Sequence, residues 1–409
     1  MFSMIRPKEM NRFFTKKAVT SLLCIFGLIV FCCLSTQLNP VNEVKRVHFD
    51  FKSLQLRLNR NYSTDIAHVI NSEMTGPNHC DPILQIVFVK TYKTASTTTA
   101  AIFERYGYYR QLTFAVGKSH VLSFQSSFSH RNVMNFPKME GKQYNILCNH
   151  ARYNRKEMEL VVPNATYVTI LRKPEDQLES AFGYFEMYKA MGLPKKNALH
   201  TFMEDPIRYY KGHNFYKWQL SRNGQLFGLG FDHRYDDSEM MIQEKVHEID
   251  KDFDLVLITE YYDESLLLLK KLLCWDFEDI LYIPTGIRST SHRFMKDGAL
   301  IEKLRRWNHG DTLLYEHFNK TLWRKISEYG SSFYADLEYF RQLNQAVFEE
   351  CIESDKKNKR DPREFRFVLK NQTDRCAALL RADVGYTNLI RRSMLDRFGK
   401  PWFWWIPFI

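Results

Sequence analysis

Apolar residues gather into four short runs in the middle of the chain, and segments of helix length follow three of them. Each run has the length of a buried strand, and together they cover residues 83–89, 144–148, 167–171 and 254–258. The segments of helix length lie at residues 97–106, 174–191 and 264–273. Strands that alternate with helices predict an α/β fold, with a parallel sheet flanked by helices.

The pattern near the N-terminus is different, because residues 18–34 are almost wholly apolar and follow a basic stretch. A cleaved signal peptide has an apolar core of about 7–15 residues, whereas a bilayer-spanning helix needs about 20. The length of this run favours an uncleaved signal anchor, with the basic flank in the cytosol. We therefore predict four regions, which are a cytosolic tail at 1–17, a transmembrane anchor at 18–36, a stem at 37–82 and a lumenal domain at 83–409.

The cysteines fit a lumenal domain, where disulfides persist. Of the 8 cysteines, those outside the predicted anchor are Cys80, Cys148, Cys274, Cys351 and Cys376. Their odd number leaves at least one thiol free or paired between chains. We predict a Cys351–Cys376 bridge, because it would hold a polar C-terminal segment in place. The sequence contains no C-x-x-C pair and no H-E-x-x-H motif, so it gives no support for a zinc site.

A lumenal domain also predicts glycan acceptors. The N-x-[ST] pattern occurs at Asn61, Asn164, Asn319 and Asn371. Such short matches arise often by chance. Asn164 comes directly before a predicted strand, where the fold itself would hinder modification.

The formal net charge of +11 makes anionic partners plausible. It does not separate nucleic acid, a membrane surface and a phosphorylated cosubstrate. The basic residues are dispersed and the domain is predicted to be lumenal, so we expect no nucleic-acid partner. The aromatic end of the chain, residues 401–409, is expected to pack over the domain, and contact with the membrane interface is the alternative.

A hydroxyl-rich turn follows the first predicted strand, and it reads Lys93-Thr94-Ala95-Ser96-Thr97-Thr98. A strand, a tight turn and a helix together present backbone N–H groups and the positive end of the helix to an anion. Lys93 adds a full charge, and the hydroxyls add hydrogen-bond donors. The turn is not a Walker loop, because it has no glycine and its lysine comes first. A polar surface turn would use the same residue types, so this motif alone leaves both interpretations open.

A second polar element follows the third predicted strand. Arg172 lies at the end of that strand, Pro174 begins a predicted helix, and Ser180 lies about two helical turns further on. The arginine offers a forked donor for phosphate, and the serine adds another hydrogen bond. A surface ion pair would also explain Arg172. Two such elements in this order, each after a buried strand, favour a site for a phosphorylated nucleotide.

The two elements resemble the nucleotide-binding motifs of sulfotransferases, the first their 5′-phosphosulfate loop and the second their 3′-phosphate element. Within that class the chain resembles the Golgi galactose-3-O-sulfotransferases. This closer resemblance lies in residues 88–103, 145–150, 263–276, 307–319 and 341–344, which follow the family order. It covers most of the predicted lumenal domain. It implies a P-loop-like sulfotransferase fold and a single-pass type II protein of the Golgi membrane.

The resemblance also implies a reaction. The cosubstrate would be 3′-phosphoadenosine 5′-phosphosulfate (PAPS), and the acceptor would be the 3-hydroxyl of a terminal galactose on a glycolipid or glycan. The residues singled out above require no metal. Lys93 would neutralise charge on the leaving phosphate, with Thr94, Ser96, Thr97 and Thr98 around the 5′ group. Arg172 and Ser180 would hold the 3′-phosphate.

The acceptor hydroxyl needs a general base, and here the chain departs from the family. The residue before the loop lysine is usually histidine in the family, but it is Tyr92 in this chain. A tyrosine with its ordinary pKa of about 10 is a poor base at neutral pH. His150, which resembles a family histidine in an Asn-His context, is therefore our predicted base.

Three questions stay open at this level. The acceptor could instead be another glycan position or a glycosaminoglycan. The Tyr92 substitution also makes a non-catalytic nucleotide-binding relative conceivable, although retention of Lys93, Arg172 and Ser180 argues against it. The sequence does not fix the oligomeric state, and a homodimer is one option.

Overall fold

A computed structural model describes residues 80–400, except 211–216, 289–292, 354–363 and 366. The predicted cytosolic tail, the anchor, nearly all of the stem, Asn61 and the aromatic residues 401–409 lie outside this part of the chain. Among the residues described, no helix is both long and apolar enough to cross a membrane.

A four-stranded parallel sheet forms the centre of the fold, in the order β2-β1-β3-β4. Its strands are β1 (Ile86–Val89), β2 (Ile146–Leu147), β3 (Thr166–Leu171) and β4 (Leu255–Ile258). Every residue of β1, β2 and β4 is buried, as expected for a parallel sheet covered on both faces. The four predicted strands are thus confirmed; β1, β2 and β4 are shorter than their apolar runs, and β3 begins one residue earlier than predicted.

Helices follow three of these strands, as predicted. They are α4 (Ser96–Tyr109) after β1, α6 (Pro174–Tyr184) after β3 and α12 (Tyr262–Leu273) after β4. The segment 174–191 is not one continuous helix, because a second short helix, α7 (Met187–Ala190), follows α6. Glu186, between them, has a φ of 48°, and this left-handed conformation ends the helical path.

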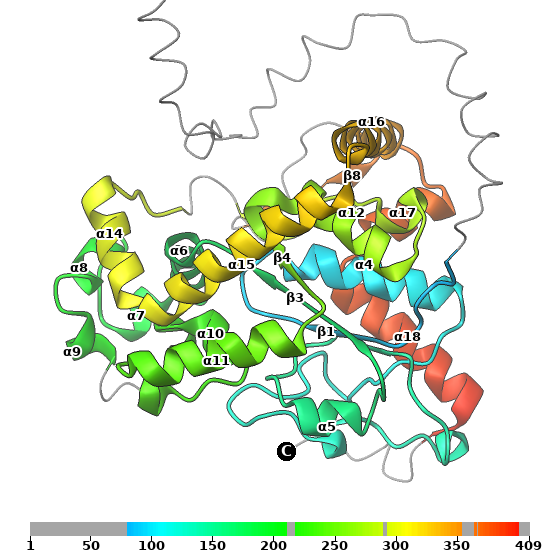
Figure 1. Cartoon of the computed structure of the whole chain (residues 1–409), viewed down its shortest axis with the longest axis horizontal. Coiled ribbons are helices and arrows are strands. Elements are labelled where there is room, and N and C mark those ends of the chain that lie inside the picture. The colour runs from blue at the N-terminus through cyan, green and yellow to red at the C-terminus, as the bar shows by residue number, and fades with distance from the viewer. Residues whose placement is uncertain (1–79, 211–216, 289–292, 354–363, 366, 401–409) are drawn as a thin grey trace, which may run out of the picture. The chain divides into compact units, whose positions relative to one another are not determined.

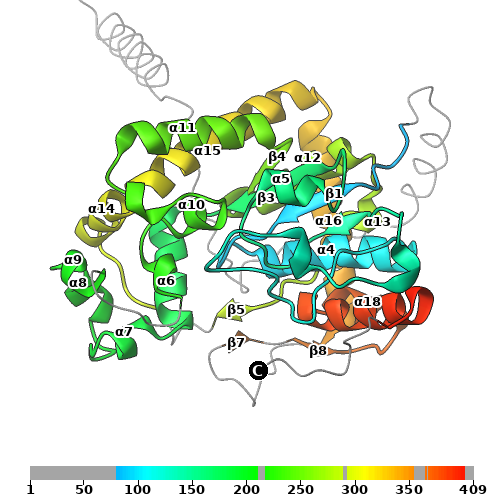
Figure 2. The ribbon, with the colours of Figure 1, turned by 90° about the horizontal axis from the view of Figure 1, so that it is seen from below.

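The helices lie on both sides of the sheet. Figure 2 shows α11 (Glu239–Asp252) and α15 (His309–Tyr329) on one side of the strands, and α4 with α18 (Asp383–Phe398) on the other. Both views place α18 directly beside α4, although their sequences are far apart (Figures 1 and 2). The expected α/β class with helices flanking a parallel sheet is therefore observed.

The remaining elements surround this centre. The other α-helices are α5 (Arg155–Glu159), α8 (Ala198–Phe202), α9 (Pro206–Tyr210), α10 (Gly224–Gly228), α13 (Phe277–Ile280), α14 (Gly298–Trp307), α16 (Phe333–Cys351) and α17 (Asp374–Leu380). Short 3₁₀ helices are η1 (His130–Asn132), η2 (Pro137–Met139), η3 (Trp218–Ser221), η4 (His233–Tyr235) and η5 (Thr259–Tyr261). Two antiparallel pairs join β5 (Ile287–Arg288) to β7 (Glu364–Phe365) and β6 (Ile352–Glu353) to β8 (Val368–Leu369).

Two hydrophobic cores hold the elements together. The larger core surrounds the sheet and includes α4, α12, α15, α16 and α18. The smaller core lies between α6, α7, α8 and α14, where Leu178, Phe182 and Phe202 meet Leu304. Because α6 begins in the loop after β3, the second core anchors the helix that carries Ser180.

Two disulfides occur in the described residues. Cys351 joins Cys376, which confirms the predicted bridge, and Cys80 joins Cys274, a pair that the sequence did not indicate. Cys148 is a buried free thiol. The odd cysteine that we expected is thus Cys148, and burial raises the pKa of its thiol and keeps it unreactive.

Candidate functional site

The loop after β1 has an unusual backbone. Lys93 and Ala95 both adopt the left-handed conformation, with φ of 63° and 62°. The Ser96 hydroxyl donates to the Thr91 carbonyl at 2.5 Å, and the hydroxyls of Thr94 and Thr91 lie 2.8 Å apart. Thr94 and Ser96 are buried, so these hydroxyls shape the loop from within.

The same loop leads into the N-terminus of α4. Thr99 donates its N–H to the Ala95 carbonyl at 3.2 Å, which is the first helical bond. The N–H groups of the preceding residues therefore lie at the positive end of the helix, where anions bind. Thr97 is half-buried, and the Thr98 hydroxyl accepts the N–H of Thr285 at 3.2 Å.

The structure brings the two predicted phosphate elements together at the carboxyl end of the sheet. The Arg172 guanidinium donates to the Lys93 carbonyl at 3.2 Å. Thr259, in the loop after β4, donates its hydroxyl to the carbonyls of Thr94 (2.8 Å) and Leu171 (2.9 Å). Gln177 of α6 donates to the Tyr92 carbonyl at 3.0 Å. Three loops of adjacent parallel strands are therefore tied into one unit, as expected at the ligand crevice of such sheets.

Ser180, the other predicted 3′-phosphate residue, lies on α6 and is only 4% exposed. Its neighbour Glu179 forms a buried ion pair with Arg288 of β5. Glu179 also accepts the Phe294 N–H at 2.7 Å. The segment that contains β5 thus reaches α6 next to Ser180.

Tyr92 and His150, the two candidate bases, are stacked on each other. Their ring centroids lie 4.0 Å apart with an interplanar angle of 7°. The Nζ atom of Lys217 lies 3.6 Å from the centroid of the same tyrosine ring. Tyr92, His150 and Lys217 therefore form one cluster, which we call the aromatic–cation stack.

Burial and the neighbouring positive charges favour the uncharged forms of His150 and Lys217. Burial, followed by the positive charges of Lys90 and Lys217, holds the pKa of His150 well below its ordinary value of 6.5. Burial and the Lys90 charge lower the pKa of Lys217 to about 7. His150 is thus a neutral imidazole at neutral pH, rather than one that titrates there as its residue type suggested.

The Nζ atoms of Lys93 and Lys217 both lie close to aromatic rings. The Nζ atom of Lys93 lies 3.7 Å from the centroid of the Tyr184 ring, at the end of α6. Lys217 lies 4.1 Å from the Phe124 ring and 5.4 Å from the Phe185 ring. Sequence reasoning did not find Lys217, and no local motif marks it. The sequence signal that could have pointed to this environment was the aromatic pair Tyr184-Phe185, which follows the second phosphate element.

Comparison with known proteins decides the family. The galactose-3-O-sulfotransferase family profile matches residues 13–366 of the chain. The chain belongs to this family. Galactosylceramide sulfotransferase of Bos taurus is 38% identical over 279 residues, which is 67% of this chain and 65% of that protein. Galactose-3-O-sulfotransferase 2 of Sus scrofa is 34% identical over 262 residues, or 63% of this chain and 65% of that protein.

A third relative in the galactose-3-O-sulfotransferase family is galactose-3-O-sulfotransferase 3 of Mus musculus, 33% identical over 279 residues. That match covers 66% of this chain and 63% of the relative. The chain thus aligns with slightly less than two thirds of the length of the relatives named here.

The C-terminal helix α18 lies beyond the part matched by the galactose-3-O-sulfotransferase family, yet it lies next to the site. Asp383, its first residue, forms a buried ion pair with Lys90, and His150 Nδ1 lies 3.2 Å from the Lys90 carbonyl. Thr387 accepts from Asn149 at 2.8 Å and donates to the buried Glu104 at 2.7 Å. Helix α18 therefore holds the Asn149-His150 segment, directly through Thr387 and indirectly through the Asp383–Lys90 ion pair.

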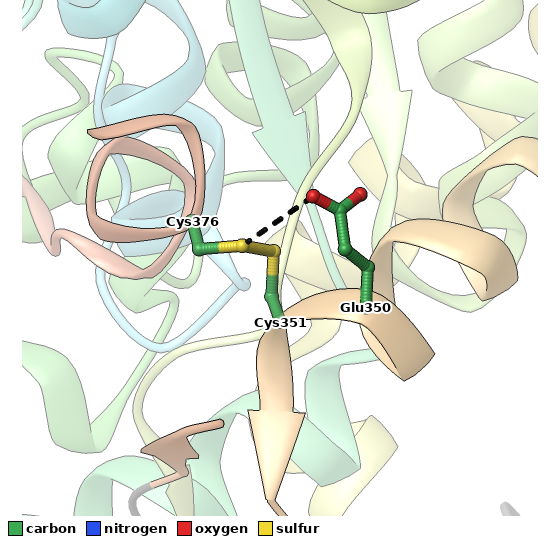
Figure 3. A group of neighbouring side chains, drawn as sticks. All are labelled: Glu350, Cys351 and Cys376. Carbon is green, nitrogen blue, oxygen red and sulfur yellow. Dashed lines mark hydrogen bonds between the residues drawn. A yellow bond between two sulfur atoms is a disulfide. The ribbon is translucent and has the colours of Figure 1, made fainter. Parts of the chain in front are cut away.

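A cation could be considered at only one cluster of the described residues, Glu350 with Cys351 and Cys376. Figure 3 shows the two sulfur atoms joined in the disulfide, with the Glu350 carboxylate beside them. Metals bind cysteine as the thiolate, and a disulfide sulfur is not one. The cluster therefore does not fit a metal ion.

The predicted glycan acceptors differ in their surroundings. Asn164 is exposed in a turn, with φ of 53°, and Asn371 is exposed with its amide donating to the Glu350 carbonyl at 2.8 Å. Asn319 lies in the middle of α15 and is half-buried. An exposed side chain is more accessible to modification than a half-buried one in a helix, so Asn164 and Asn371 are the stronger predictions. For Asn164 this differs from our expectation that the adjacent strand would hinder modification.

Proposed function

We propose that this chain transfers a sulfuryl group from PAPS to the 3-hydroxyl of a terminal galactose on a glycolipid or glycan. The observation that carries the proposal is the contact between the two phosphate elements, in which Arg172 donates to the Lys93 carbonyl. The residues of both elements are those that sulfotransferases use for this nucleotide. Membership of the galactose-3-O-sulfotransferase family supports the galactose acceptor.

The chemistry of the donors suits such a nucleotide. PAPS, when bound, supplies an activated sulfuryl group on a 5′-phosphate. The α4 N-terminus, with Thr97 and Thr98, would bind the 5′ group, and Thr94 and Ser96 would support it by holding the loop. Arg172 and Ser180 would bind the 3′-phosphate. Lys93 would turn from the Tyr184 ring and stabilise the charge that develops on the leaving phosphate.

His150 would act as the general base. A carbonyl oxygen only accepts hydrogen bonds, so the contact with Lys90 places the proton on Nδ1 and leaves a lone pair on Nε2. The acceptor oxygen would form a bond to sulfur while the bond from sulfur to the phosphate oxygen breaks. Nε2 would take the hydroxyl proton, and the electron pair would remain on the phosphate of the product nucleotide, 3′-phosphoadenosine 5′-phosphate (PAP).

We further propose that the chain is a single-pass type II protein of the Golgi membrane, with the anchor at 18–36 and the domain 83–409 in the lumen. The disulfides Cys80–Cys274 and Cys351–Cys376 support an oxidising compartment. Glycans at Asn61, Asn164, Asn319 and Asn371 would agree with this orientation. Digestion of the expressed protein with an endoglycosidase, followed by a gel, would test it.

Sulfate transfer by the full-length chain tests the proposed reaction. Labelled PAPS would be supplied with galactosylceramide, lactosylceramide, galactose-terminated glycoprotein glycans and chondroitin, beside a Lys93→Ala control. We expect transfer to terminal galactose in the wild type and none in the variant. Transfer to chondroitin alone would replace galactose by a glycosaminoglycan. Tight binding of PAP without transfer to any acceptor would favour a non-catalytic relative.

A further inference from the structure

Helix α15 reaches the loop after β3 through two relays of hydrogen bonds, the first starting from buried groups and the second lying nearer the surface. We propose that Asp311 and Tyr315 of α15 are positioning residues that set the nucleotide selectivity of the Arg172 element. The two residues are one helical turn apart and thus share one face of the helix. This inference rests on the proposed role of Arg172 at the 3′-phosphate. It adds that α15 holds the backbone of Arg172 in the position which that role requires.

The first relay runs from Asp311 through Gln225 to Arg172. The side chains of Asp311 and Gln225 are fully buried. The Asp311 carboxylate accepts the backbone N–H groups of Gln225 (3.0 Å) and Leu226 (2.8 Å) at the start of α10. The Gln225 side chain then binds both backbone groups of Arg172. Its Oε1 accepts the Arg172 N–H, and its Nε2 donates to the Arg172 carbonyl, each at 2.8 Å.

The Gln225 side chain pairs with the N–H and the carbonyl of Arg172, as a neighbouring strand pairs with a residue of a sheet. Arg172 directly follows the last residue of β3, where backbone groups leave the sheet ladder. An amide that donates and accepts at the same residue fixes its backbone in two places. Replacing this amide would leave two part-buried backbone groups without these partners, which costs more than the loss of an ordinary hydrogen bond.

The second relay runs from Tyr315 through Glu260 to Lys173. The Tyr315 hydroxyl donates to one Glu260 oxygen at 3.2 Å, and the other oxygen accepts the Lys173 N–H at 3.1 Å. Glu260 belongs to η5, in the loop after β4. The two relays therefore hold the adjacent residues Arg172 and Lys173 in the loop after β3. One passes through α10 and the other through η5, and both start from the same face of α15.

A glycine allows α15 to approach α10 closely enough for these bonds. A Cβ atom at Gly310 would lie 2.6 Å from the Leu226 Cδ1 atom and 3.2 Å from the Asn223 side chain. Asn223 accepts the Asp311 N–H at 3.1 Å, and its own N–H donates to Asn308 at 2.9 Å. The start of α15 is thus locked against α10, so the relays begin from a rigid base.

The relays matter for selectivity because a guanidinium–phosphate contact depends strongly on direction. With its backbone held, Arg172 reaches the Lys93 carbonyl at 3.2 Å and stays beside the loop. A looser backbone would weaken the contact with a 3′-phosphate and leave the 5′ group unaffected. The expected signature is a smaller preference for PAP over adenosine 5′-monophosphate, which lacks the 3′-phosphate.

Calorimetric titration of the full-length chain with these two nucleotides tests the proposal. The variants are Gln225→Leu, which removes the first relay, and Tyr315→Phe, which removes one hydroxyl from the second. Tyr153→Phe is a matched control, because the Tyr153 hydroxyl donates to Asp252 at 2.6 Å away from both phosphate elements. We expect the ratio of the two Kd values to fall about tenfold in Gln225→Leu and about threefold in Tyr315→Phe. The control should keep the wild-type ratio.

The ratio is measured on one preparation, so it does not depend on how much of a variant folds. Equal weakening of both nucleotides in Gln225→Leu and Tyr315→Phe would overturn the inference, because a purely structural role predicts that result. An equal fall in the Tyr153→Phe control would also overturn it. If the wild-type chain itself shows no preference for PAP, the proposed role of Arg172 fails, and the inference fails with it.

Discussion

The loop that carries Lys93 has two sides, and they are held by different kinds of contact. On the proposed nucleotide side, Arg172, Thr259 and Gln177 donate hydrogen bonds to loop carbonyls. On the proposed acceptor side, the aromatic–cation stack of Tyr92, His150 and Lys217 contacts the loop through ring faces. Hydrogen bonds fix direction, whereas stacked rings fix separation and allow sliding.

This difference suits the proposed reaction, in which the nucleotide would be fixed and the acceptor could differ between family members. A fixed nucleotide gains from rigid donors, because little order is lost on binding. The relatives named above include a galactosylceramide sulfotransferase and other galactose-3-O-sulfotransferases. A stack of rings beside the loop could accommodate differences of acceptor without disturbing the phosphate elements. Four substitutions test whether the two sides are separable in this way.

The largest effect is expected on the acceptor side, for His150→Ala. Loss of a general base lowers the rate of chemistry about 10²–10⁴-fold, and the nucleotide side should be unaffected. Single-turnover sulfate transfer gives the rate, and titration with PAP gives the Kd. Tyr92→Phe keeps the ring stack without the hydroxyl and should retain the rate. A large loss in Tyr92→Phe, with His150→Ala active, would transfer the role of base to the tyrosine.

The next effect is expected on the nucleotide side, for Arg172→Met. Loss of a charged hydrogen bond costs about 1.5–3 kcal/mol, so PAP should bind about 10–100-fold more weakly. The transfer rate at saturating PAPS should change much less, because the acceptor side is intact. Initial rates over a range of PAPS concentrations separate KM from kcat. A fall in kcat without a change in KM would show that the two sides are not separable.

A shift in pH dependence is expected for Lys217→Met. His150 must be neutral to accept a proton, so activity falls as the pH drops through its pKa. At those pH values Lys217, whose own pKa is about 7, is protonated and disfavours the imidazolium. Lys90 and His120 also disfavour the imidazolium. Removing the Lys217 charge raises the pKa of His150, so the acid limb of the pH–rate profile should move to higher pH.

The control for that shift is Lys245→Met. Lys245 pairs with Glu248 on α11 at 2.8 Å, so its removal changes the net charge equally without altering the stack. Its acid limb should coincide with that of the wild type. An unchanged limb in Lys217→Met would mean that the Lys217 charge does not act on His150.

The smallest effect is expected for Ala95→Gly, at the left-handed residue before α4. Glycine adopts this conformation without steric cost, and its greater unfolded-state entropy offsets part of the gain. We expect the free energy of unfolding to rise by about 0.5 kcal/mol, with little change in PAP affinity. Ala190→Gly in α7 should instead destabilise the fold. Denaturant unfolding would measure both, and a less stable Ala95→Gly would show that its backbone is not strained.

The sequence predicted the parts of the site that are local. Lys93 and Arg172 were found because each follows a short apolar run, and such runs indicate buried strands. Gln225, Thr259 and Lys217 were not found, because each contributes a single side chain from a distant segment. Their hydrogen bonds and ring contacts depend on tertiary packing, to which local periodicity is insensitive. The break at Glu186 was missed for a related reason, since glutamate is a good helix former.

The sheet shows the same limit. Its parallel strands followed from their alternation with helices, but the order β2-β1-β3-β4 does not follow from spacing. The Cys351–Cys376 bridge was predicted because it would hold a polar C-terminal segment in place. The Cys80–Cys274 bridge was not, because five cysteines allow many pairings.

The Cys80–Cys274 bridge also has a consequence for the order of events during synthesis. Its two cysteines are separated by 194 residues, so at about 5–20 residues per second the ribosome needs about 10–40 s between them. Cys148 emerges in that interval and could pair wrongly with Cys80. In the folded chain Cys148 is buried directly after β2, which removes this competitor. Correct oxidation of the nascent chain is therefore favoured when Cys148 becomes buried before Cys80 is oxidised.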